Sequence, residues 1–260
     1  MLYRKPMTLA AALCALALLT SGCSDDDGKT PPDSGGHQDA AGSDLYPDLG
    51  LPPDLGQKTP CETEWIDALH AQDKVSTGAV STSEQSGVYT TNVDASAGGM
   101  NGASKNPFVY LSLKDGSKVE ITDLASKSSK DWDIALRRAV LRVNGGDSGA
   151  GGAAVARVEN TTFADVTAVP AAANFEADEF LDASCKVARD PINNPQTAFS
   201  GPSTADLWYE YDMSTSKVKP KAIVWIIKRT DGSFVKLSID SYYGGTGNKS
   251  GHFTLTWSAL

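Results

Sequence analysis

The chain has 260 residues and a formal net charge of −9 at pH 7. The first 22 residues contribute +2 and residues 23–60 contribute −6, so residues 61–260 carry −5. An acidic domain without a basic stripe repels phosphate, which excludes a nucleic-acid binder.

The N-terminus, residues 1–22, has the pattern of a bacterial lipoprotein signal. A short basic stretch, residues 1–5, precedes an apolar run over residues 9–19. That run is shorter than the about 20 residues of a membrane-spanning helix and fits a cleaved secretory signal. Small residues lead into Cys23, which we expect to carry the lipid; the alternative is an ordinary secretory signal with an incidental cysteine. Ser24, directly after it, favours the outer membrane of the cell envelope.

Residues 24–60 form a polar tether. They are rich in Asp, Pro, Gly and Ser and contain few apolar side chains. Such a segment cannot bury enough surface to offset the entropy of ordering its chain, so we expect it to be disordered. Proline and like charges keep it extended. The lipidated cysteine and tether thus occupy residues 23–60, and residues 61–260 are long enough for one domain with one core.

The four cysteines reduce to two in the mature domain, because Cys14 leaves with the signal and Cys23 takes the lipid. Cys61 and Cys185 remain in an oxidising compartment, where one disulfide between them is the simplest outcome. Two free thiols are the alternative. The chain has no CxxC pair, so these cysteines indicate neither a zinc ribbon nor a redox motif.

The first half of the domain opens with a helical pattern and continues as strands. Apolar side chains at helical spacing predict a short amphipathic helix over residues 62–74. Segments rich in Val, Thr and Tyr predict strands, two of them joined by a turn at residues 115–116. These strands cover residues 75–83, 87–93, 108–113 and 118–122. The apolar run 132–143 could be a helix, but its β-branched residues and the following Asn-Gly-Gly favour a strand or a pair of strands.

The second half is more plainly made of strands. A glycine-rich loop, 144–153, precedes one or two strands within 154–169, and residues 174–186 form a short helix or an ordered loop. Alternating apolar residues then predict strands over residues 207–212, 222–229, 234–243 and 252–257. Many short strands joined by Gly and Asp turns indicate an all-β domain, a sandwich or a twisted sheet. Large aromatics dominate burial in such domains, so we expect these to anchor the core: Trp132, Trp208, Trp225 and Trp257.

The sequence offers little for catalysis. His70 and His252 are the only histidines after the tether, and no GxSxG nucleophile elbow is present. The loop 144–152 has the glycine content of a phosphate loop but lacks its GKS or GKT ending, so a mobile or tight surface loop is the better interpretation. Paired carboxylates such as Asp131 and Asp133 are usually solvated. We therefore predict that the protein is not an enzyme.

Two sequence blocks, in this order, resemble the HmuY family of haem-binding bacterial surface lipoproteins. The first is DWDIALRR at residues 131–138, followed by VNGG at 143–146. The second is IIKRTDGSFVKL at residues 226–237, followed by SYY at 241–243 and a last aromatic strand. The resemblance covers roughly residues 80–257. It implies an all-β fold in which finger-like loops grip haem, and a haemophore that passes haem to an outer-membrane receptor.

The family's best-known mode holds the iron between two His or Met side chains, one of them just after the WDIA block. Here that neighbourhood reads Leu136-Arg137-Arg138, without His or Met. Residues 164–174, where the second is expected, also contain neither. The resemblance therefore implies haem as the cofactor, while the positions expected to supply its axial ligands are not matched.

Other side chains could take over contacts with haem. Met and Tyr also ligate haem iron, and the candidates are Met100, Met213, Tyr242 and Tyr243. Arg137 and Arg138 could pair with the haem propionates. The plainer alternatives are methionines that fill gaps, half-buried tyrosines and strand arginines that face solvent.

These observations predict a cell-surface lipoprotein that binds haem or a related porphyrin for uptake and touches the membrane only through its lipid. The alternative is a HmuY-like domain that does not bind haem and serves as a structural or protein-interaction module on the cell envelope.

Overall fold

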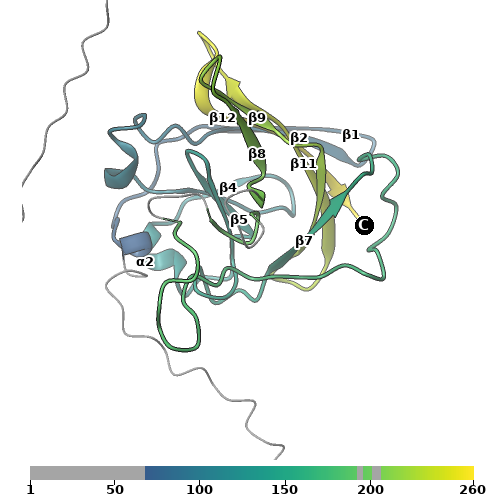
Figure 1. Cartoon of the computed structure of the whole chain (residues 1–260), viewed down its shortest axis with the longest axis horizontal. Coiled ribbons are helices and arrows are strands. Elements are labelled where there is room, and N and C mark those ends of the chain that lie inside the picture. Colours follow the sequence, from purple (N-terminus) through teal and green to yellow (C-terminus); the bar gives the residue numbers. More distant parts are fainter. Residues whose placement is uncertain (1–67, 192–195, 201–205) are drawn as a thin grey trace, which may run out of the picture. The chain divides into compact units, whose positions relative to one another are not determined.

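A computed structural model describes residues 68–191, 196–200 and 206–260 (Figure 1). The predicted signal, the tether, Cys23 and Cys61 lie outside these residues, so the predicted lipidation and the Cys61–Cys185 disulfide stay predictions. The structure is all-β, as predicted, with a six-stranded, a four-stranded and a two-stranded antiparallel sheet. No helix in the described ranges is long and apolar enough to cross a membrane.

The six-stranded sheet carries most of the core. Its strands follow the order β1 (Val80–Gln85), β2 (Val88–Asp94), β12 (Lys249–Ala259), β11 (Phe234–Gly244), β10 (Ile223–Lys228) and β7 (Ala154–Glu159). Side chains alternate between the two faces of a strand. In β12, Phe253, Leu255 and Trp257 are therefore buried, while Thr254 and Thr256 between them are partly exposed.

The four-stranded sheet packs its apolar side chains against this core, so the domain is a sandwich. Its order is β4 (Lys118–Val119), β3 (Val109–Leu111), β5 (Ile134–Arg137) and β6 (Val140–Val143). Leu111 and Leu136 from this sheet share one buried cluster with Trp225, Leu237 and Leu255 from the larger sheet. The run 132–143 is therefore a pair of strands, and all four predicted tryptophan anchors are at most 1% exposed.

A smaller apolar cluster lies apart from the main core. Phe108, Tyr110, Trp132 and Ala135 form it, and two short helical turns, η1 (Ala68–His70) and α2 (Asp123–Ser126), contact each other beside it. The Trp132 indole N–H donates to the Ser126 carbonyl at 3.0 Å, and the Tyr110 hydroxyl donates to Asp123 at 2.8 Å. These bonds fix α2 over the four-stranded sheet.

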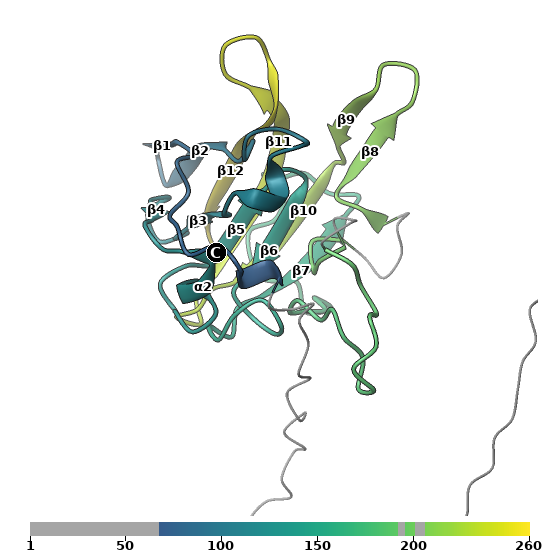
Figure 2. The same cartoon turned by 90° about the vertical axis from the view of Figure 1, so that its left-hand side faces the viewer.

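Two hairpins stand out from the body on the same side, and we call them the fingers (Figure 2). One is formed by β8 (Tyr209–Asp212) and β9 (Lys217–Pro220), and the other is the end of β11 and β12 around residues 245–248. The Val218 amide of β9 donates to the Tyr243 hydroxyl of β11 at 2.9 Å and so links the two fingers.

Several sequence expectations need correction. The helix predicted over residues 62–74 is, in its described part, a single 3-10 turn. Beyond it the backbone pairs with α2 instead: Leu124 donates to the Gln72 carbonyl, and Val75 forms a bridge with Thr122. The strand predicted from residue 75 begins only at Val80. Residues 174–186 form the ordered loop rather than the helix, and β9 and η2 (Ala103–Lys105) were not predicted.

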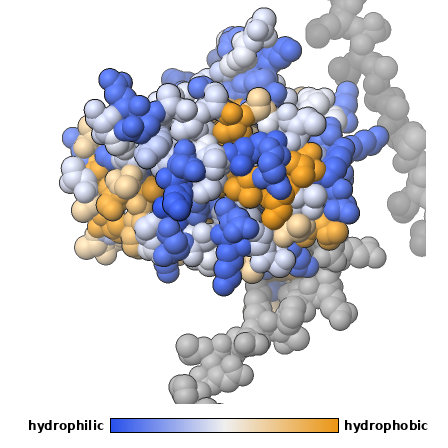
Figure 3. Space-filling model, turned by 180° about the vertical axis from the view of Figure 1, so that it is seen from behind, coloured by the Kyte–Doolittle hydropathy of each residue, from blue (hydrophilic) through white to orange (hydrophobic). Residues whose placement is uncertain are grey.

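The face seen from behind is mixed in character (Figure 3). Hydrophilic side chains separate its apolar patches from one another. Such scattered exposure is normal for a folded domain, and it does not by itself indicate a binding surface.

Candidate functional site

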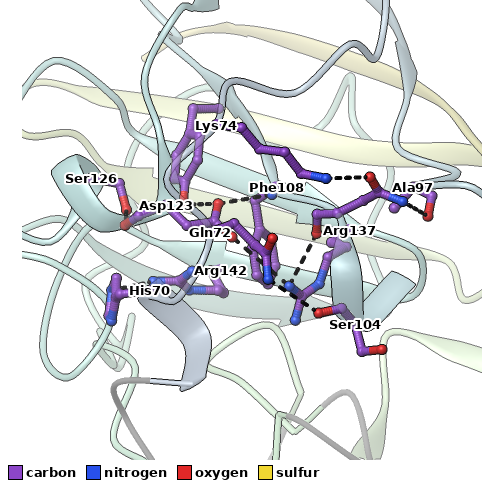
Figure 4. Close-up of polar contacts among 12 residues, drawn as sticks. His70, Gln72, Lys74, Ala97, Ser104, Phe108, Asp123, Ser126, Arg137 and Arg142 are labelled. Atoms are coloured by element: carbon purple, nitrogen blue, oxygen red, sulfur yellow. Dashed lines mark hydrogen bonds and ion pairs between the residues drawn. The ribbon is translucent and has the colours of Figure 1, made fainter. Parts of the chain in front are cut away.

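The candidate site is a pocket of about 210 Å³ where residues 74–78, 94–98 and 106–109 meet. Asn106 organises its rim. The Asn106 amide donates to the carbonyls of Ala97 and Gly102, each at 3.1 Å, and the Lys74 ammonium donates to the Asn106 side-chain oxygen at 3.1 Å (Figure 4). These bonds close the loop 97–106 on itself and tie the segment before β1 to it.

Asp94, at the end of β2, is shared by this pocket and a second one of about 220 Å³. Its carboxylate accepts the Ser96 amide at 3.0 Å and lies 3.6 Å from His252 on the neighbouring strand β12. Partial burial would raise the pKa of Asp94, but the hydrogen bonds from Ser96 and the charges of His252 and Lys249 lower it. The carboxylate is therefore ionised at neutral pH and gives both pockets a negative wall.

A buried charged cluster lies behind the rim (Figure 4). The Arg137 guanidinium stacks 4.1 Å from the Phe108 ring centroid, donates to the Asn106 carbonyl at 3.4 Å and lies 3.9 Å from Asp123. Burial, partly offset by Asp123, lowers the pKa of Arg137. Arg142 approaches the same ring, at 4.6 Å. Arg137, predicted as either a propionate partner or a solvent-facing arginine, is thus a buried residue that Asp123 partly neutralises.

Arg138 holds the turn between β5 and β6. Its backbone is in the left-handed region, at φ 52°, and its amide donates to the Ala95 carbonyl at 2.7 Å. Its guanidinium donates to the Ser250 hydroxyl at 2.8 Å. Arg138 is only partly buried, so of the two predicted arginines it is the one that reaches the surface beside the β11–β12 finger.

The glycine-rich loop after β6 is tight rather than mobile, and much of it is buried. The Asn144 amide donates to the Trp132 carbonyl at 2.7 Å, and its oxygen accepts the Gly151 amide at 3.0 Å. A Cβ atom on Gly145 would lie 2.0 Å from the Ala153 carbonyl oxygen, so only glycine fits there. The Asn-Gly-Gly signature therefore serves packing.

The predicted iron ligands are spread over three places. Met100 is 84% exposed in the loop 97–106, and Met213 is 82% exposed at the tip of the β8–β9 finger. Tyr242 is buried against Trp208, whereas Tyr243 is half-buried and accepts the bond from β9. Met100, Arg137 and Arg138 thus lie on or beside the segment 95–106, whereas Met213 and Tyr243 belong to the fingers and Tyr242 belongs to the core.

The fit to haem is partial. The two exposed thioethers are of a kind that ligates haem iron. Each pocket is smaller than the roughly 300–1,000 Å³ of sites that enclose drug-sized ligands, so neither would enclose a porphyrin in this conformation. Leu136, in the neighbourhood expected to supply an axial ligand, is fully buried in the core. The exposed methionines of the loop 97–106 and of the β8–β9 finger lie outside both pockets.

Sequence reasoning missed the burial of Asp123 and Asp178. The residues around Asp178 do not distinguish it from the solvent-exposed aspartates that are far commoner in proteins. The one usable signal was Thr122 before Asp123, since Thr is a frequent N-cap and its hydroxyl does accept the Ala125 amide at 3.1 Å.

Comparison with known proteins gives a match to one family model and likenesses to solved structures. The family model described as HmuY protein matches residues 104–257. Among solved structures, a Bacteroides vulgatus protein described as HmuY-like and haem-binding is 16% identical, with 72% of this chain and 97% of that chain covered and a TM-score of 0.44. The apo HmuY analog of Tannerella forsythia is 17% identical, with 72% and 99% covered and a TM-score of 0.44. No curated protein matches the chain.

Proposed function

The chain belongs to the HmuY family, and on this premise we propose that it binds haem or a related porphyrin at the cell surface for uptake. The observation that carries the proposal is the extent of the family match, residues 104–257, which includes the β8–β9 finger and almost all of the β11–β12 hairpin. The role is binding and transfer rather than catalysis.

The proposed iron ligand on the β8–β9 finger is Met213. Asp212 shapes the turn that presents it: its carboxylate accepts the Ser214 amide at 2.8 Å and the Thr215 hydroxyl at 2.7 Å. The Ser214 hydroxyl, which donates to the same carboxylate at 2.6 Å, is the largest cause that lowers the pKa of Asp212 to about 2, followed by the Thr215 hydroxyl and the Ser214 amide. The turn therefore keeps its charge-assisted bonds at any physiological pH. An ordered turn holds the thioether in solvent, where it is accessible to iron. Met100, in the loop 97–106, is the second candidate.

Arg138 is the proposed propionate partner. Arg137 is engaged with Phe108 and Asp123, whereas Arg138 is partly exposed beside the β11–β12 finger. Tyr242 packs against Trp208 in the core and Tyr243 accepts the Val218 amide, and we assign them no direct role in iron binding.

The cellular setting follows from the N-terminal segment. We propose that lipid on Cys23 anchors the protein, that residues 24–60 act as the spacer, and that Cys185 pairs with Cys61. A spacer of this composition lets the domain move away from the membrane surface. An outer-membrane receptor would be the acceptor of the haem.

One observation favours a second function. The neighbourhood expected to supply an axial ligand holds Leu136 in the core and Arg137 in a charged cluster, so ligation there is not available. A HmuY-like domain that uses its fingers to bind another envelope protein, without haem, is therefore the alternative.

Titration of residues 61–260 with haemin, followed by the Soret band in both oxidation states, separates the two. A haem-binding protein gives a saturable, red-shifted band with a sharp low-spin spectrum. Met213→Ala, and Met100→Ala beside it, then locate the ligand by loss of the low-spin features. A broad band that does not saturate and matches a non-specific control protein would contradict haem ligation and leave the interaction module.

A further inference from the structure

We propose that the pair Asn101–Gly102, in the loop 97–106 beside the candidate pocket, is a site of spontaneous deamidation whose isoaspartate product opens this loop. The chain contains two Asn-Gly pairs, Asn101–Gly102 and Asn144–Gly145. The first is exposed and the second is buried and hydrogen-bonded, so the folded protein should modify them at different rates. The proposal is independent of haem binding.

The reaction needs only water and the two residues themselves. The deprotonated backbone nitrogen of glycine attacks Cγ of the preceding asparagine, a new C–N bond forms, and the side-chain nitrogen leaves as ammonia. Water then opens the cyclic imide at either carbonyl and gives aspartate or isoaspartate, with no oxidation or reduction. Glycine favours the attack because no Cβ atom crowds its nitrogen. The asparagine side chain must therefore be free to turn toward the next amide.

Asn101 meets this requirement. It is exposed in a turn, and its side chain makes no hydrogen bond within the described residues. The Gly102 amide donates to the Gly99 carbonyl at 3.2 Å, at the long end of the range for such bonds. The same carbonyl also accepts the Ala103 amide at 3.1 Å. Release of the Gly102 amide thus breaks one long hydrogen bond and leaves the Gly99 carbonyl with a partner.

Asn144 is held in place on both sides of its amide group. The side chain is fully buried, and its nitrogen donates to the Ser129 carbonyl at 3.0 Å and the Trp132 carbonyl at 2.7 Å. Its oxygen accepts the Gly151 amide at 3.0 Å. Turning this side chain toward the Gly145 nitrogen breaks all three bonds, which leaves buried polar groups without partners. The fold therefore protects this pair.

Isoaspartate at position 101 prevents the loop from closing as it does now. It carries the main chain through Cβ, which lengthens the backbone between Ala97 and Gly102, the residues whose carbonyls the Asn106 amide joins at 3.1 Å each. Gly102 has little space in which to shift, since a Cβ atom there would lie 2.8 Å from the Gly98 carbonyl oxygen. Isoaspartate therefore costs one of the two Asn106 bonds, whereas aspartate leaves the backbone length unchanged and keeps both.

Incubation of the purified protein in mildly alkaline buffer, followed by peptide mass spectrometry, measures both pairs in one sample. Deamidation raises the mass of a peptide because OH replaces NH2, and electron-transfer fragmentation separates aspartate from isoaspartate. In the folded protein, Asn101 should react at least about tenfold faster than Asn144, which must first break three buried hydrogen bonds. In urea the two rates should be similar. Asn101→Gln, whose longer side chain closes a less favourable ring, should stay unmodified at this position.

Hydrogen exchange of the aged protein tests the effect on the loop. In the isoaspartate fraction, residues 97–106 should exchange about fivefold to tenfold faster than in the fresh protein, the effect of one lost hydrogen bond. Asn101→Asp carries the new charge on an unaltered backbone, and should exchange like the fresh protein.

Two results would overturn the proposal. The first is equal deamidation of Asn101 and Asn144 in the folded protein, or no reaction at Asn101 under conditions that modify it in urea. The second is exchange over residues 97–106 that is the same in the isoaspartate fraction and the fresh protein, or is equally accelerated in Asn101→Asp.

Discussion

Asp133 shows how one residue of the family motif can be structural rather than chemical. One carboxylate oxygen accepts the Thr230 amide at 3.0 Å, and the other accepts the Leu113 amide at 2.7 Å and lies 3.4 Å from Arg229. The side chain is 2% exposed and joins the turn after β10 to the end of β3. The sequence predicted that both Asp131 and Asp133 are solvated. Asp131 is exposed, as predicted, whereas Asp133 is buried and hydrogen-bonded.

Replacing Asp133 by Asn should destabilise the domain by about 2–4 kcal/mol, because an amide offers one acceptor oxygen where two are used and its buried NH2 group would face the Leu113 or Thr230 amide as a second donor. Urea unfolding followed by tryptophan fluorescence measures the change. Asp131→Asn is the matched control and should change the free energy of unfolding by less than about 0.5 kcal/mol. Equal effects of the two substitutions would contradict the assigned role.

Tyr110 provides a test at alkaline pH. Burial raises its pKa far above the usual value of about 10, and the bond to Asp123 acts in the same direction. The neutral phenol thus stabilises the fold fully below about pH 10, and this contribution is lost as the pH rises further. Above about pH 10, wild type should lose more stability than Tyr110→Phe. Parallel curves of unfolding free energy against pH would show that Tyr110 does not contribute in this way.

At the scale of elements, strands with alternating burial were predictable and elements made by tertiary contacts were not. The alternation of Phe253, Leu255 and Trp257 marks β12 in the sequence itself. By contrast, β9 reads Lys-Val-Lys-Pro, and only its pairing with β8 makes it a strand. The helical spacing around Leu69 predicted a longer helix because sequence periodicity cannot show that Gln72 will pair with α2 instead.

The candidate site was predictable only in part, because tertiary contacts bring its residues together. Met100 and Arg138 were identified because their residue types suit haem, and they do lie near one loop. Asp94 and His252 meet because β2 and β12, more than 150 residues apart in sequence, are neighbours in the sheet. Strand order cannot be read from local spacing.

The hydrogen bond between the two fingers leads to a prediction about amide exchange in the β8–β9 hairpin. Tyr243→Phe removes the acceptor of the Val218 amide and should speed amide exchange in β8–β9 by about fivefold to tenfold, the effect of one lost hydrogen bond of about 1 kcal/mol. Global stability should change little, because the two-stranded sheet is peripheral. Tyr242→Phe, next to it, is the control and should leave exchange in β9 unchanged. A similar response in both variants would show that the bond does not order the finger.

At the scale of the whole molecule, the residues that stabilise the fold are separate from the proposed ligand residues. The sandwich core, the Asn144 loop and Asp133 hold the body together. The exposed methionines lie outside that core, on a loop and a finger. We expect substitutions of these proposed ligand residues to cost little stability, because they lie outside the core.

The most direct test of the proposed function is a hydrogen-exchange comparison of the protein with and without haemin. If the fingers and the Met100 loop grip haem, protection should rise in residues 97–106, 209–220 and 244–249 and remain unchanged over residues 163–175, which pack on the far face of β10. Unchanged exchange in all three segments at saturating haemin, or protection confined to residues 163–175, would contradict the account and favour the interaction module.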